Sequence, residues 1–498
     1  MRRPRRSQVL IVEPGAAQAH VFSAFAKLPL LGPLYLGTLL EQAGFRAKVV
    51  SENLLGRSLG AADLDADFLL LSCLTPTVER GYELADLFKR RNPQGKVLMG
   101  GPHVSFMSEE ALRHADWVVA GEAEEVVVDL LRNGCESGVV QGRPVEDLDR
   151  LPEIDWSLLV GAGRLALHPF MFSRGCPFGC NFCSVTSMFG RRYRAMSVER
   201  VLAELARPFA PASAFFYDDN FAAHRARTHA ILDGLLARNR RVDFVAQVRA
   251  DVTRDEELLS KMARVGCARV YVGFESVDDG SLREMNKGQT GEDVRRSIRL
   301  FHRHGIHVHG MFMFGADAEG PESIRAAAEL VRQQRVDSVQ YMVMTPFPGT
   351  ELFRRLEGED RLLHRVWRYY DGAHVVIRPK RFTPSQLQRL ALGCYGEYYG
   401  LRQALGTGLE AAAASVGRAF GVAPERWGAP TLTNAFLKVV GTQIVRRWLG
   451  QNADYLRYLA GMGASAAKVA EGGPAATATP PPGYAGASAG RLSSTHSP

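Results

Sequence analysis

Short apolar runs alternate with amphipathic stretches through the first 135 residues. The apolar runs are short and poor in charge, as is typical of parallel strands buried on both faces, and they lie at 8–14, 47–51, 67–73, 96–101 and 116–121. The stretches between them repeat apolar residues with a helical period, at 33–44, 78–91, 105–113 and 122–133. This order of strand and helix predicts a doubly wound, Rossmann-like α/β domain over residues 8–135.

The same alternation returns at residue 169. Six apolar runs, with helical patterns between them, lie at 170–174, 214–218, 243–249, 268–275, 306–314 and 337–344. Six βα units predict a partial (β/α)6 barrel of the TIM type over residues 169–350, with its active face at the carboxyl ends of the strands. Residues 136–168 show no strong period and contain Pro144 and Pro152, so we expect a connector there.

The two ends of the chain and the segment after the barrel differ in composition from the rest. Residues 1–7 contain four arginines and predict a basic disordered arm. Helical patterns at about 384–420 and 430–461 predict a mostly helical C-terminal region over residues 351–465. Residues 466–498 are poor in large apolar groups, so we expect a disordered tail.

Composition and charge narrow the class of protein. A chain of 498 residues with 46% hydrophobic and 23% charged residues can bury two full cores. The formal net charge is +8, of which the arm supplies four, and no basic stripe is interleaved with aromatics, so we expect no nucleic-acid partner. The longest apolar stretch, Val21 to Phe45, is interrupted by charged residues and prolines and is not expected to span a membrane.

Three cysteines stand on one short loop directly after the first predicted barrel strand. Cys176, Cys180 and Cys183 have the spacing CxxxCxxC within the sequence FMFSRGCPFGCNFCS, residues 170–184. Three thiolates on such a loop can ligate three irons of a 4Fe-4S cluster and leave the fourth iron open for a substrate or cofactor. A structural zinc site is the alternative, but it usually takes four ligands, and the remaining cysteines are solitary: Cys73, Cys135, Cys267 and Cys394. With no secretory signal, we expect reduced thiols and a cytoplasmic protein.

With Phe182 before its last cysteine, this loop resembles the cluster loop of radical S-adenosylmethionine (SAM) enzymes. The resemblance implies that the amino and carboxylate groups of SAM chelate the open iron. Ahead of it, the order of strand, GGPH, strand and GEAEE at 96–125 resembles the N-terminal domain of cobalamin-dependent radical SAM enzymes. That resemblance implies a corrinoid over the strand ends, near Ser72, Leu74, Thr75, Gly100, Gly101, His103, Gly121 and Glu122.

Two expected signatures are absent from the N-terminal half. No GxGxxG follows the first strand, which argues against a nicotinamide or flavin dinucleotide. The DxHxxG signature that supplies a lower histidine ligand to cobalt is also absent. Many members of the family lack it and bind the corrin without a protein imidazole, whereas some relatives keep the fold and bind no cobalamin. For His103 we expect a bond to the backbone or to the nucleotide tail of the cofactor, with ligation of cobalt as the alternative.

The ends of the barrel strands supply candidates for binding SAM. An arginine suits the carboxylate of SAM through its planar fork of donors, and an acidic residue suits the ribose. By resemblance, the residues that bind SAM are Glu275, Ser276 and Arg249. The alternative for each is a helix cap or a salt bridge within a loop.

Three other segments carry expectations that a structure can test. Asp218 and Asp219 are expected to cap a helix from Phe221 onward. The segment 364–388 resembles the one that follows the barrel in many of these enzymes and should pack beside the open barrel edge. One face of the fifth strand is expected to pack on helices, with the alternative that it lines the barrel; by a period of two, that face carries His307, His309, Met311 and Met313.

Together these parts predict an enzyme in which a reduced cluster cleaves SAM to methionine and a 5'-deoxyadenosyl radical, which abstracts hydrogen from an unactivated carbon. With cobalamin, the expected outcome is methylation of that carbon. The alternatives are radical cyclisation, oxidation or carbon–carbon coupling of a small-molecule, tetrapyrrole or lipid substrate, and a non-catalytic corrinoid or iron-sulfur sensor. The expected partners are a small-molecule or lipid-like substrate and an external electron donor of the flavodoxin or ferredoxin type. A peripheral membrane contact through the helix at 430–461 is the alternative to its docking on the body.

Overall fold

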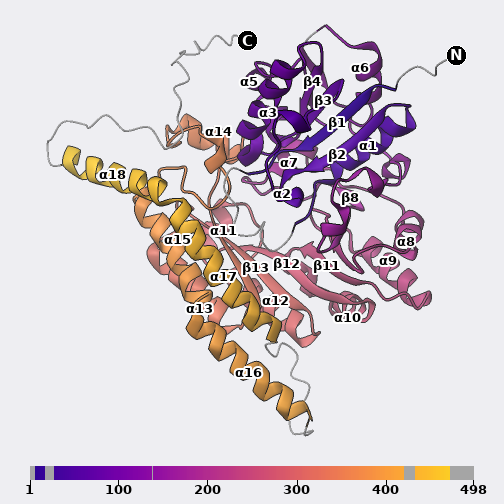
Figure 1. The fold of residues 1–498 in the computed structure, drawn as a ribbon. Coiled ribbons are helices and arrows are strands. Elements are labelled where there is room, and N and C mark those ends of the chain that lie inside the picture. Colours follow the sequence, from indigo (N-terminus) through magenta and orange to yellow (C-terminus); the bar gives the residue numbers. More distant parts are fainter. Residues whose placement is uncertain (1–5, 17–26, 137, 420–431, 471–498) are drawn as a thin grey trace.

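The computed structural model describes residues 6–16, 27–136, 138–419 and 432–470. Two parallel sheets, one from each half of this region, form the centres of the fold, and the C-terminal helices lie across the second (Figure 1). The predicted α/β fold with a helical C-terminal region is therefore confirmed. Most of the predicted arm and tail lies outside the described residues, except that helix α18 (Ala453–Ala470) continues into the first residues of the expected tail.

The first sheet has the strand order β2-β1-β3-β4-β5-β6, and its pairs are parallel. Its strands are β1 (Gln8–Glu13), β2 (Arg46–Ser51), β3 (Phe68–Ser72), β4 (Lys96–Gly100), β5 (Trp117–Ala120) and β6 (Gly138–Gln141). The first five match the predicted strands. Strand β6 lies in the segment expected to be a connector, and its four half-exposed residues are too few to show a period.

Helices join these strands on both faces of the sheet. They are α1 (Leu31–Gln42), α2 (Glu52–Leu55), α3 (Val78–Arg91), α4 (Pro102–Phe106), α5 (Ser108–Ala111) and α6 (Val127–Asn133). The helix predicted at 105–113 is thus two short helices that start earlier, because Gly101, with φ of 99°, turns the chain directly into Pro102.

The second sheet is also parallel and has the order β14-β13-β12-β11-β10-β7. Its strands are β7 (His168–Phe170), β10 (Ser213–Phe216), β11 (Asp243–Val248), β12 (Cys267–Glu275), β13 (His307–Phe314) and β14 (Ser338–Val343). The first predicted barrel strand is divided. Strand β7 joins the sheet, whereas β8 (Ser173–Arg174) turns away and pairs antiparallel with β9 (Arg194–Ala195).

Helices follow the barrel strands in the predicted alternation. They are α7 (Ser184–Phe189), α8 (Val198–Ala206), α9 (Arg225–Ala237), α10 (Glu256–Val265), α11 (Asp279–Glu284), α12 (Gly291–Arg303) and α13 (Pro321–Gln333). Short 3-10 turns complete the described chain at Ala61–Asp63, Thr75–Thr77, Leu148–Arg150, Trp156–Leu158, Ala162–Arg164, Ala250–Arg254 and Trp367–Tyr369.

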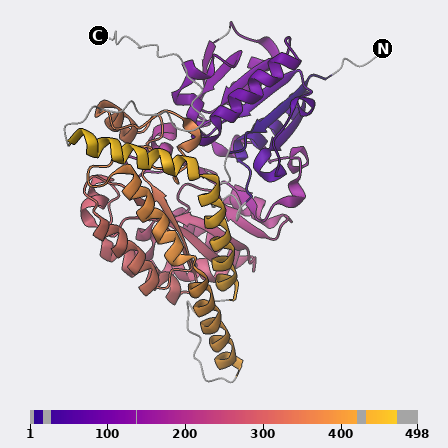
Figure 2. The ribbon, with the colours of Figure 1, turned by 60° about the vertical axis from the view of Figure 1, so that its left-hand side comes forward.

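The C-terminal region is built from five helices among the described residues. They are α14 (Glu351–Gly358), α15 (Pro384–Tyr398), α16 (Leu401–Ala419), α17 (Leu432–Gln451) and α18. Each of the two long helices predicted here is divided, the first between Tyr398 and Leu401 and the second at Asn452. In Figure 2 these helices run along one side of the barrel.

Helix α15 covers the open edge of the barrel sheet with tyrosine hydroxyls. The Tyr399 hydroxyl, just after the helix, donates to the Val339 carbonyl at 2.8 Å and accepts from the Val339 amide at 3.4 Å. The Tyr395 hydroxyl accepts from the Tyr341 amide at 3.0 Å. These hydroxyls replace the next strand, so the edge of β14 has partners without a further strand beside it.

The segment that follows the barrel also packs at this edge, as its sequence predicts. The Val343 amide, near the end of β14, donates to the Gly372 carbonyl at 2.8 Å. The imidazole of His374 is buried between Asp371 and Asn452, with Nε2 2.8 Å from Asn452 Oδ1. The segment is thereby fixed between the barrel edge and α18.

We predict that Tyr399→Phe destabilises the barrel by about 1–3 kcal/mol, because the buried amide and carbonyl of Val339 lose their partner. The measurement is the midpoint of chemical unfolding followed by circular dichroism. The control is Tyr458→Phe, a half-buried tyrosine whose ring contacts His364 and Tyr455, which should change stability by less than about 0.5 kcal/mol. Equal midpoints for the two variants would contradict the role given to the Tyr399 hydroxyl.

Candidate functional site

The carboxyl edges of the two sheets face each other. Glu13 ends β1 of the first sheet, and Tyr217 follows β10 of the second. Burial, and then the negative charge of Glu13, raise the pKa of the Tyr217 phenol, so the two side chains are close enough to interact electrostatically. Phe106 and Gly349 meet elsewhere along the same boundary, where a Cβ on Gly349 would lie 2.4 Å from the ring of Phe106. Ligands of parallel α/β sheets bind at such edges.

The cysteine loop begins at this boundary and is held on both sides by hydrogen bonds between side chains and the backbone. The Gly175 amide donates to Asp219 Oδ2 at 3.0 Å, which ties the loop to the end of β10. On the other side, the Asn181 side-chain amide donates to the Glu284 carbonyl at 2.7 Å, and the Asn286 side-chain amide donates to the Gly179 carbonyl at 2.7 Å. The position of the loop is therefore fixed by the barrel.

The three thiols are free, and Cys180 is buried while Cys176 and Cys183 are half-buried. Burial raises the pKa of the Cys176 thiol, and raises that of Cys183 to about 11, while backbone amides that point at the two sulfurs act in the opposite direction. These amides and a nearby guanidinium are the groups that stabilise sulfur once it is deprotonated by a metal.

The loop carries the three free thiols that a four-iron cluster takes from a protein. Among the residues described, no three His, Cys, Asp or Glu side chains converge on one point where they could hold one metal ion. A four-iron cluster makes a different demand, because each thiolate ligates a different iron and the sulfurs stay apart. Three free cysteines within eight residues, with backbone amides directed at the sulfurs, meet that demand.

A buried basic pair lies directly beside the loop. The Arg249 guanidinium lies 3.8 Å above the ring of Phe178, with Nη1 3.7 Å from Cys180 Sγ. Its Nη2 donates to the Lys287 carbonyl. Lys287 Nζ pairs with Glu275 Oε1 at 2.7 Å, and both side chains are buried. The sequence predicted Arg249 and Glu275 here but not Lys287, whose place depends on the turn after α11.

Glu275 has an unusual backbone conformation for a residue with a side chain. Its φ is 61°, in the left-handed region, and it lies where the pairing of β12 with β13 shifts register. Such strain is retained where the surrounding structure holds a side chain in one position. Ser276, predicted with it, is buried and accepts a hydrogen bond from the Asp278 amide at 3.1 Å, so its hydroxyl shapes the turn before α11.

Buried acids surround this region. Burial raises the pKa of Asp218 and of Asp219 to about 6, and that of Glu13 to about 7. The expectation that Asp218 and Asp219 cap a helix from Phe221 is wrong, because α9 starts at Arg225 and is capped by His224, which accepts from the Arg227 amide. Asp218 instead accepts from the Ser173 hydroxyl, and Asp219 from Gly175.

The histidine face of β13 points into the barrel, so the expectation of a face packed on helices is wrong. Tyr341 marks the outer face, because it lines a groove with Ile324 and Val331 of α13. Phe312 and Phe314 contact Tyr341 on that outer side. By alternation His309, Met311 and Met313 lie on the inner face, and the His309 ring is 4.5 Å from that of Tyr271. His307, at the start of the strand, contacts Asp337 at 2.7 Å and lies far from the carboxyl edge.

The glycines predicted to approach a corrinoid lie at the carboxyl edge of the first sheet. Gly101 and Gly121 have φ of 99° and 106°, and a Cβ on Gly101 would come within 2.8 Å of the Cys73 amide nitrogen. Ser72 ends β3, Gly100 ends β4, and Leu74 and Thr75 begin the following turn. These positions share one edge, as the sequence predicts.

His103 contacts a side chain at that edge rather than the backbone group expected for it. Its imidazole is buried, with Nδ1 3.3 Å from the Thr75 hydroxyl and Nε2 4.0 Å from Glu110 Oε1. The ring of Trp367, from the segment after the barrel, lies 4.9 Å from it, and the indole nitrogen donates to Glu110 at 2.9 Å. His103 therefore belongs to a contact between the first domain and the post-barrel segment.

Glu122 is engaged in a clamp of buried charges between the two halves of the chain. Its carboxylate accepts from Arg174 Nη1 at 2.6 Å and pairs with Arg194, while Arg174 Nη2 pairs with Glu124 at 2.6 Å. We call Glu122, Glu124, Arg174 and Arg194 the interdomain clamp. Burial opposes ionisation of Glu122, but the two arginines outweigh it and hold the pKa of its carboxyl below the usual range. The clamp is absent from the sequence-based expectations, because it joins residues far apart in the chain.

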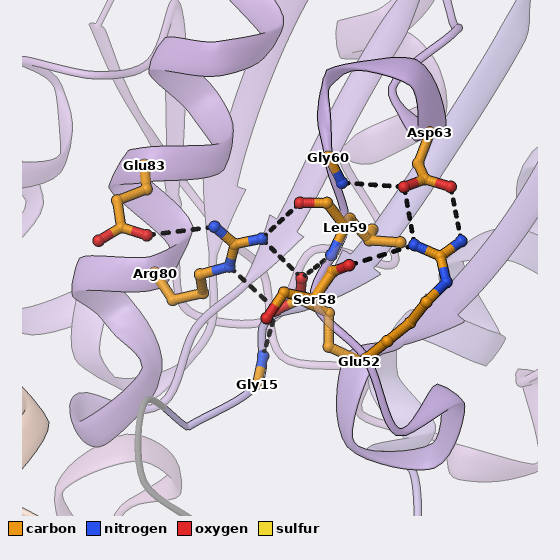
Figure 3. A network of polar contacts seen from close by, with 9 residues as sticks. Gly15, Glu52, Ser58, Leu59, Gly60, Asp63, Arg80 and Glu83 are labelled. Atoms are coloured by element: carbon orange, nitrogen blue, oxygen red, sulfur yellow. Dashed lines mark hydrogen bonds and ion pairs between the residues drawn. The ribbon is translucent and has the colours of Figure 1, made fainter.

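A second buried network holds Gly15, just after β1, against Glu52 and Arg80 (Figure 3). The Glu52 carboxylate accepts from the amides of Gly15 at 2.8 Å and Leu59 at 2.6 Å, and pairs with Arg80 at 2.9 Å. On the other side of residues 17–26, Glu13 accepts from the Leu30 amide at 3.0 Å. Both ends of this connection are therefore anchored at the carboxyl edge of the first sheet.

Two family descriptions match the chain: the B12 binding domain over residues 20–131 and the radical SAM superfamily over residues 170–331. An uncharacterized methyltransferase of Pyrococcus horikoshii is 29% identical over 79% of this chain and 92% of its own length. Bacteriochlorophyllide d C-12(1)-methyltransferase of Chlorobaculum tepidum is 28% identical over 64% of this chain and 72% of its own. Anaerobic magnesium-protoporphyrin IX monomethyl ester cyclase of Rubrivivax gelatinosus is 27% identical over 68% of this chain and 66% of its own.

Two solved structures share the fold. The cobalamin-dependent S-adenosylmethionine radical enzyme OxsB, with aqua-cobalamin and S-adenosylmethionine bound, superposes with a TM-score of 0.63 over 94% of this chain and 81% of its own, at 14% identity. The radical S-adenosylmethionine methyltransferase TsrM of Kitasatospora setae, with cobalamin and a [4Fe-4S] cluster, has a TM-score of 0.57 over 71% of this chain and 78% of its own, at 18% identity.

We predict that Arg174→Met destabilises the protein by about 3–5 kcal/mol, because it leaves Glu122 and Glu124 short of a buried counter-charge. The matched control is Arg192→Met, on the same segment, whose pair with Glu146 is exposed and should cost less than about 1 kcal/mol. The measurement is the unfolding midpoint of each variant. If the clamp contributes nothing to stability, Arg174→Met and Arg192→Met will have the same unfolding midpoint.

We predict that Glu319→Gln stabilises the protein increasingly from about pH 5 to pH 8. Burial raises the pKa of Glu319 to about 8 in the folded chain, so folding takes up a proton wherever the unfolded carboxyl is ionised. The free energy of unfolding of the parent therefore falls by about 1.4 kcal/mol for each pH unit above the unfolded pKa of Glu319, and this loss levels off above pH 8. Glutamine avoids it and can still accept the hydrogen bond from the Gly315 amide. Thermal midpoints of both proteins across this range give the difference, and a difference that does not change with pH would contradict the assignment.

Proposed function

This chain belongs to the radical SAM enzymes that carry a B12-binding domain, and we propose that it methylates an unactivated carbon of its substrate. The observation that carries the proposal is that the carboxyl edges of the two sheets face each other across the interdomain clamp. One edge carries the glycines of the B12-binding domain and the other carries the cysteine loop. A methyl-carrying cofactor and a radical-generating cofactor would therefore share one chamber.

The cysteine loop and its neighbours fit the cluster and SAM. We assign Cys176, Cys180 and Cys183 as the ligands of three of the four irons of the cluster. Arg249, beside Cys180, offers a fork of donors to the carboxylate of SAM, and Glu275, held by Lys287, lies at the next strand end for the ribose. Ser276 supports this region through its turn. When bound, the reduced cluster supplies the electron that cleaves SAM, and cobalamin supplies the methyl group.

The edge of the first sheet fits a flat cofactor at Ser72, Thr75, Gly100, Gly101 and Gly121. Two predicted contacts receive other roles in the proposal. His103 contacts Trp367 and supports the edge without ligating cobalt, and Glu122 holds the edge against the cysteine loop. The cobalamin is then bound without an imidazole from His103.

The proposed substrate is a small molecule with a large apolar surface, of the tetrapyrrole or lipid kind. The inner face of the barrel supports this, because it carries an aromatic row in which Tyr271 contacts both Phe215 and His309. Two relatives named above act on bacteriochlorophyllide and magnesium-protoporphyrin substrates according to their names. An external flavodoxin- or ferredoxin-type electron donor, a cytoplasmic location and a peripheral membrane contact complete the proposal.

Radical cyclisation without methyl transfer is the second candidate, supported by the likeness to a cyclase. A non-catalytic corrinoid or iron-sulfur sensor has less support, because such a sensor does not need a chamber with an aromatic row.

The test is turnover by anaerobically reconstituted protein given dithionite as the electron donor, hydroxocobalamin, SAM with a labelled methyl group, and a candidate tetrapyrrole or lipid substrate. We expect the parent to form 5'-deoxyadenosine and to retain cobalamin. The variant Cys176→Ala should bind no cluster and form no deoxyadenosine. Cys135→Ala removes an exposed cysteine outside the loop and should behave like the parent.

Each result separates the candidates. Label transferred to a substrate carbon supports methylation. Deoxyadenosine without retained cobalamin favours cyclisation or coupling. If the parent and Cys176→Ala both fail to form deoxyadenosine and bind equal iron, the enzyme proposal is wrong.

A further inference from the structure

The helical hairpin α16–α17 exposes large apolar side chains. Of the seven large hydrophobic residues that are exposed in the part of the chain described, six lie on these two helices. The most exposed are Leu405, Leu409 and Phe436, at 70%, 73% and 65%. Side chains of this size are exposed singly on most proteins, whereas a group on one element marks a contact surface.

Five of these six side chains, all except Leu449, lie on one side of the hairpin. Ala404, Gly408 and Ala411 of α16 are spaced for one helix face, and Gly408 packs against Ala435 of α17. Leu405 and Leu409 each come one residue after a member of that face, and Phe436 comes one residue after Ala435. In two antiparallel right-handed helices, the same one-residue offset turns both sets to the same side. We call Leu401, Leu405, Leu409, Phe436 and Val439 the apolar strip.

The strip faces away from the body of the protein. The opposite side of α16 carries Gln403, Thr407 and Glu410, which line a groove of about 1130 Å³ shared with α13 and α15. Figures 1 and 2 both show α16 extending beyond the barrel, so the strip runs along a projecting edge.

The charge of this region suits an anionic surface. Residues 401–470 contain eight Lys and Arg but only three Asp and Glu. Helix α17 has no acidic residue, and exposed Arg447 lies eleven residues after Phe436, about three helical turns on, which places it on the side of the strip. Glu410 points to the groove, where its carboxylate lies 3.8 Å from Arg335. The strip is therefore flanked by positive charge.

We propose that the apolar strip lies on the surface of an anionic lipid bilayer. Among the described residues none of the helices is long and apolar enough to cross a bilayer, so the contact is interfacial. A second copy of the chain is a poorer occupant, because it would bring two regions of equal positive charge together. The inference rests on the proposed function only in that a bilayer would supply an apolar substrate; the contact itself needs no turnover.

The experiment is flotation of the full chain with vesicles of phosphatidylcholine alone or with phosphatidylglycerol. We expect binding that rises with phosphatidylglycerol and falls with salt. Leu405→Ser with Leu409→Ser and Phe436→Ser should lower the bound fraction about ten-fold or more. Val139→Ser, at the exposed apolar residue outside the hairpin, is the matched control and should bind like the parent. Arg447→Gln should weaken binding only to the anionic vesicles.

The outcomes decide between occupants. Failure of the parent to float at any phosphatidylglycerol content overturns the proposal, as does equal flotation of the triple variant. A parent that is dimeric in solution and a triple variant that is monomeric would assign the strip to a second copy instead. Unchanged circular dichroism in the triple variant keeps these results interpretable. Deoxyadenosine formation measured without vesicles tests the proposed function separately, so either idea can fail alone.

Discussion

The buried attraction between Glu122 and the two arginines Arg174 and Arg194 is the interaction on which the arrangement of the site depends. The clamp joins the end of β5 in the first sheet to the ribbon that carries the cysteine loop of the second half. The arginines lie opposite each other on the β8–β9 ribbon, and Arg174 is two residues before Cys176. A shift of the first domain would therefore separate buried charges in a region of low dielectric, which costs free energy. Because of this cost, the distance between the cysteine loop and the first sheet is fixed.

Charge around the loop is balanced at short range. Arg249 and Lys287 lie on the side of Cys180, and Glu275 neutralises Lys287. Asp218 and Asp219 lie on the other side and carry raised pKa values, about 6 each, because burial disfavours their ionised forms. Arg249 also pairs with Asp251 at 3.3 Å, so a cofactor at this loop would meet cations that already have carboxylate partners.

Much of the fold follows from local patterns. Strands buried on both faces are continuous apolar runs, and so β1 and β3 could be placed to within one or two residues. The cysteine spacing predicts the cluster loop because the three residues that carry the chemistry are neighbours in sequence. Strand β6 could not be predicted, because it is only four residues long, is half-exposed and forms by pairing with β5.

The sequence by itself determined the two α/β halves, the positions of most of their strands along the chain and the loop that carries Cys176, because hydrophobic periodicity and ligand spacing are local properties. Only the tertiary structure decided which polar side chains meet. It paired Glu122 with Arg174, placed His103 against Trp367, and directed His309 into the barrel. These outcomes depend on contacts between residues far apart in the chain, whose energies exist only once both elements have packed.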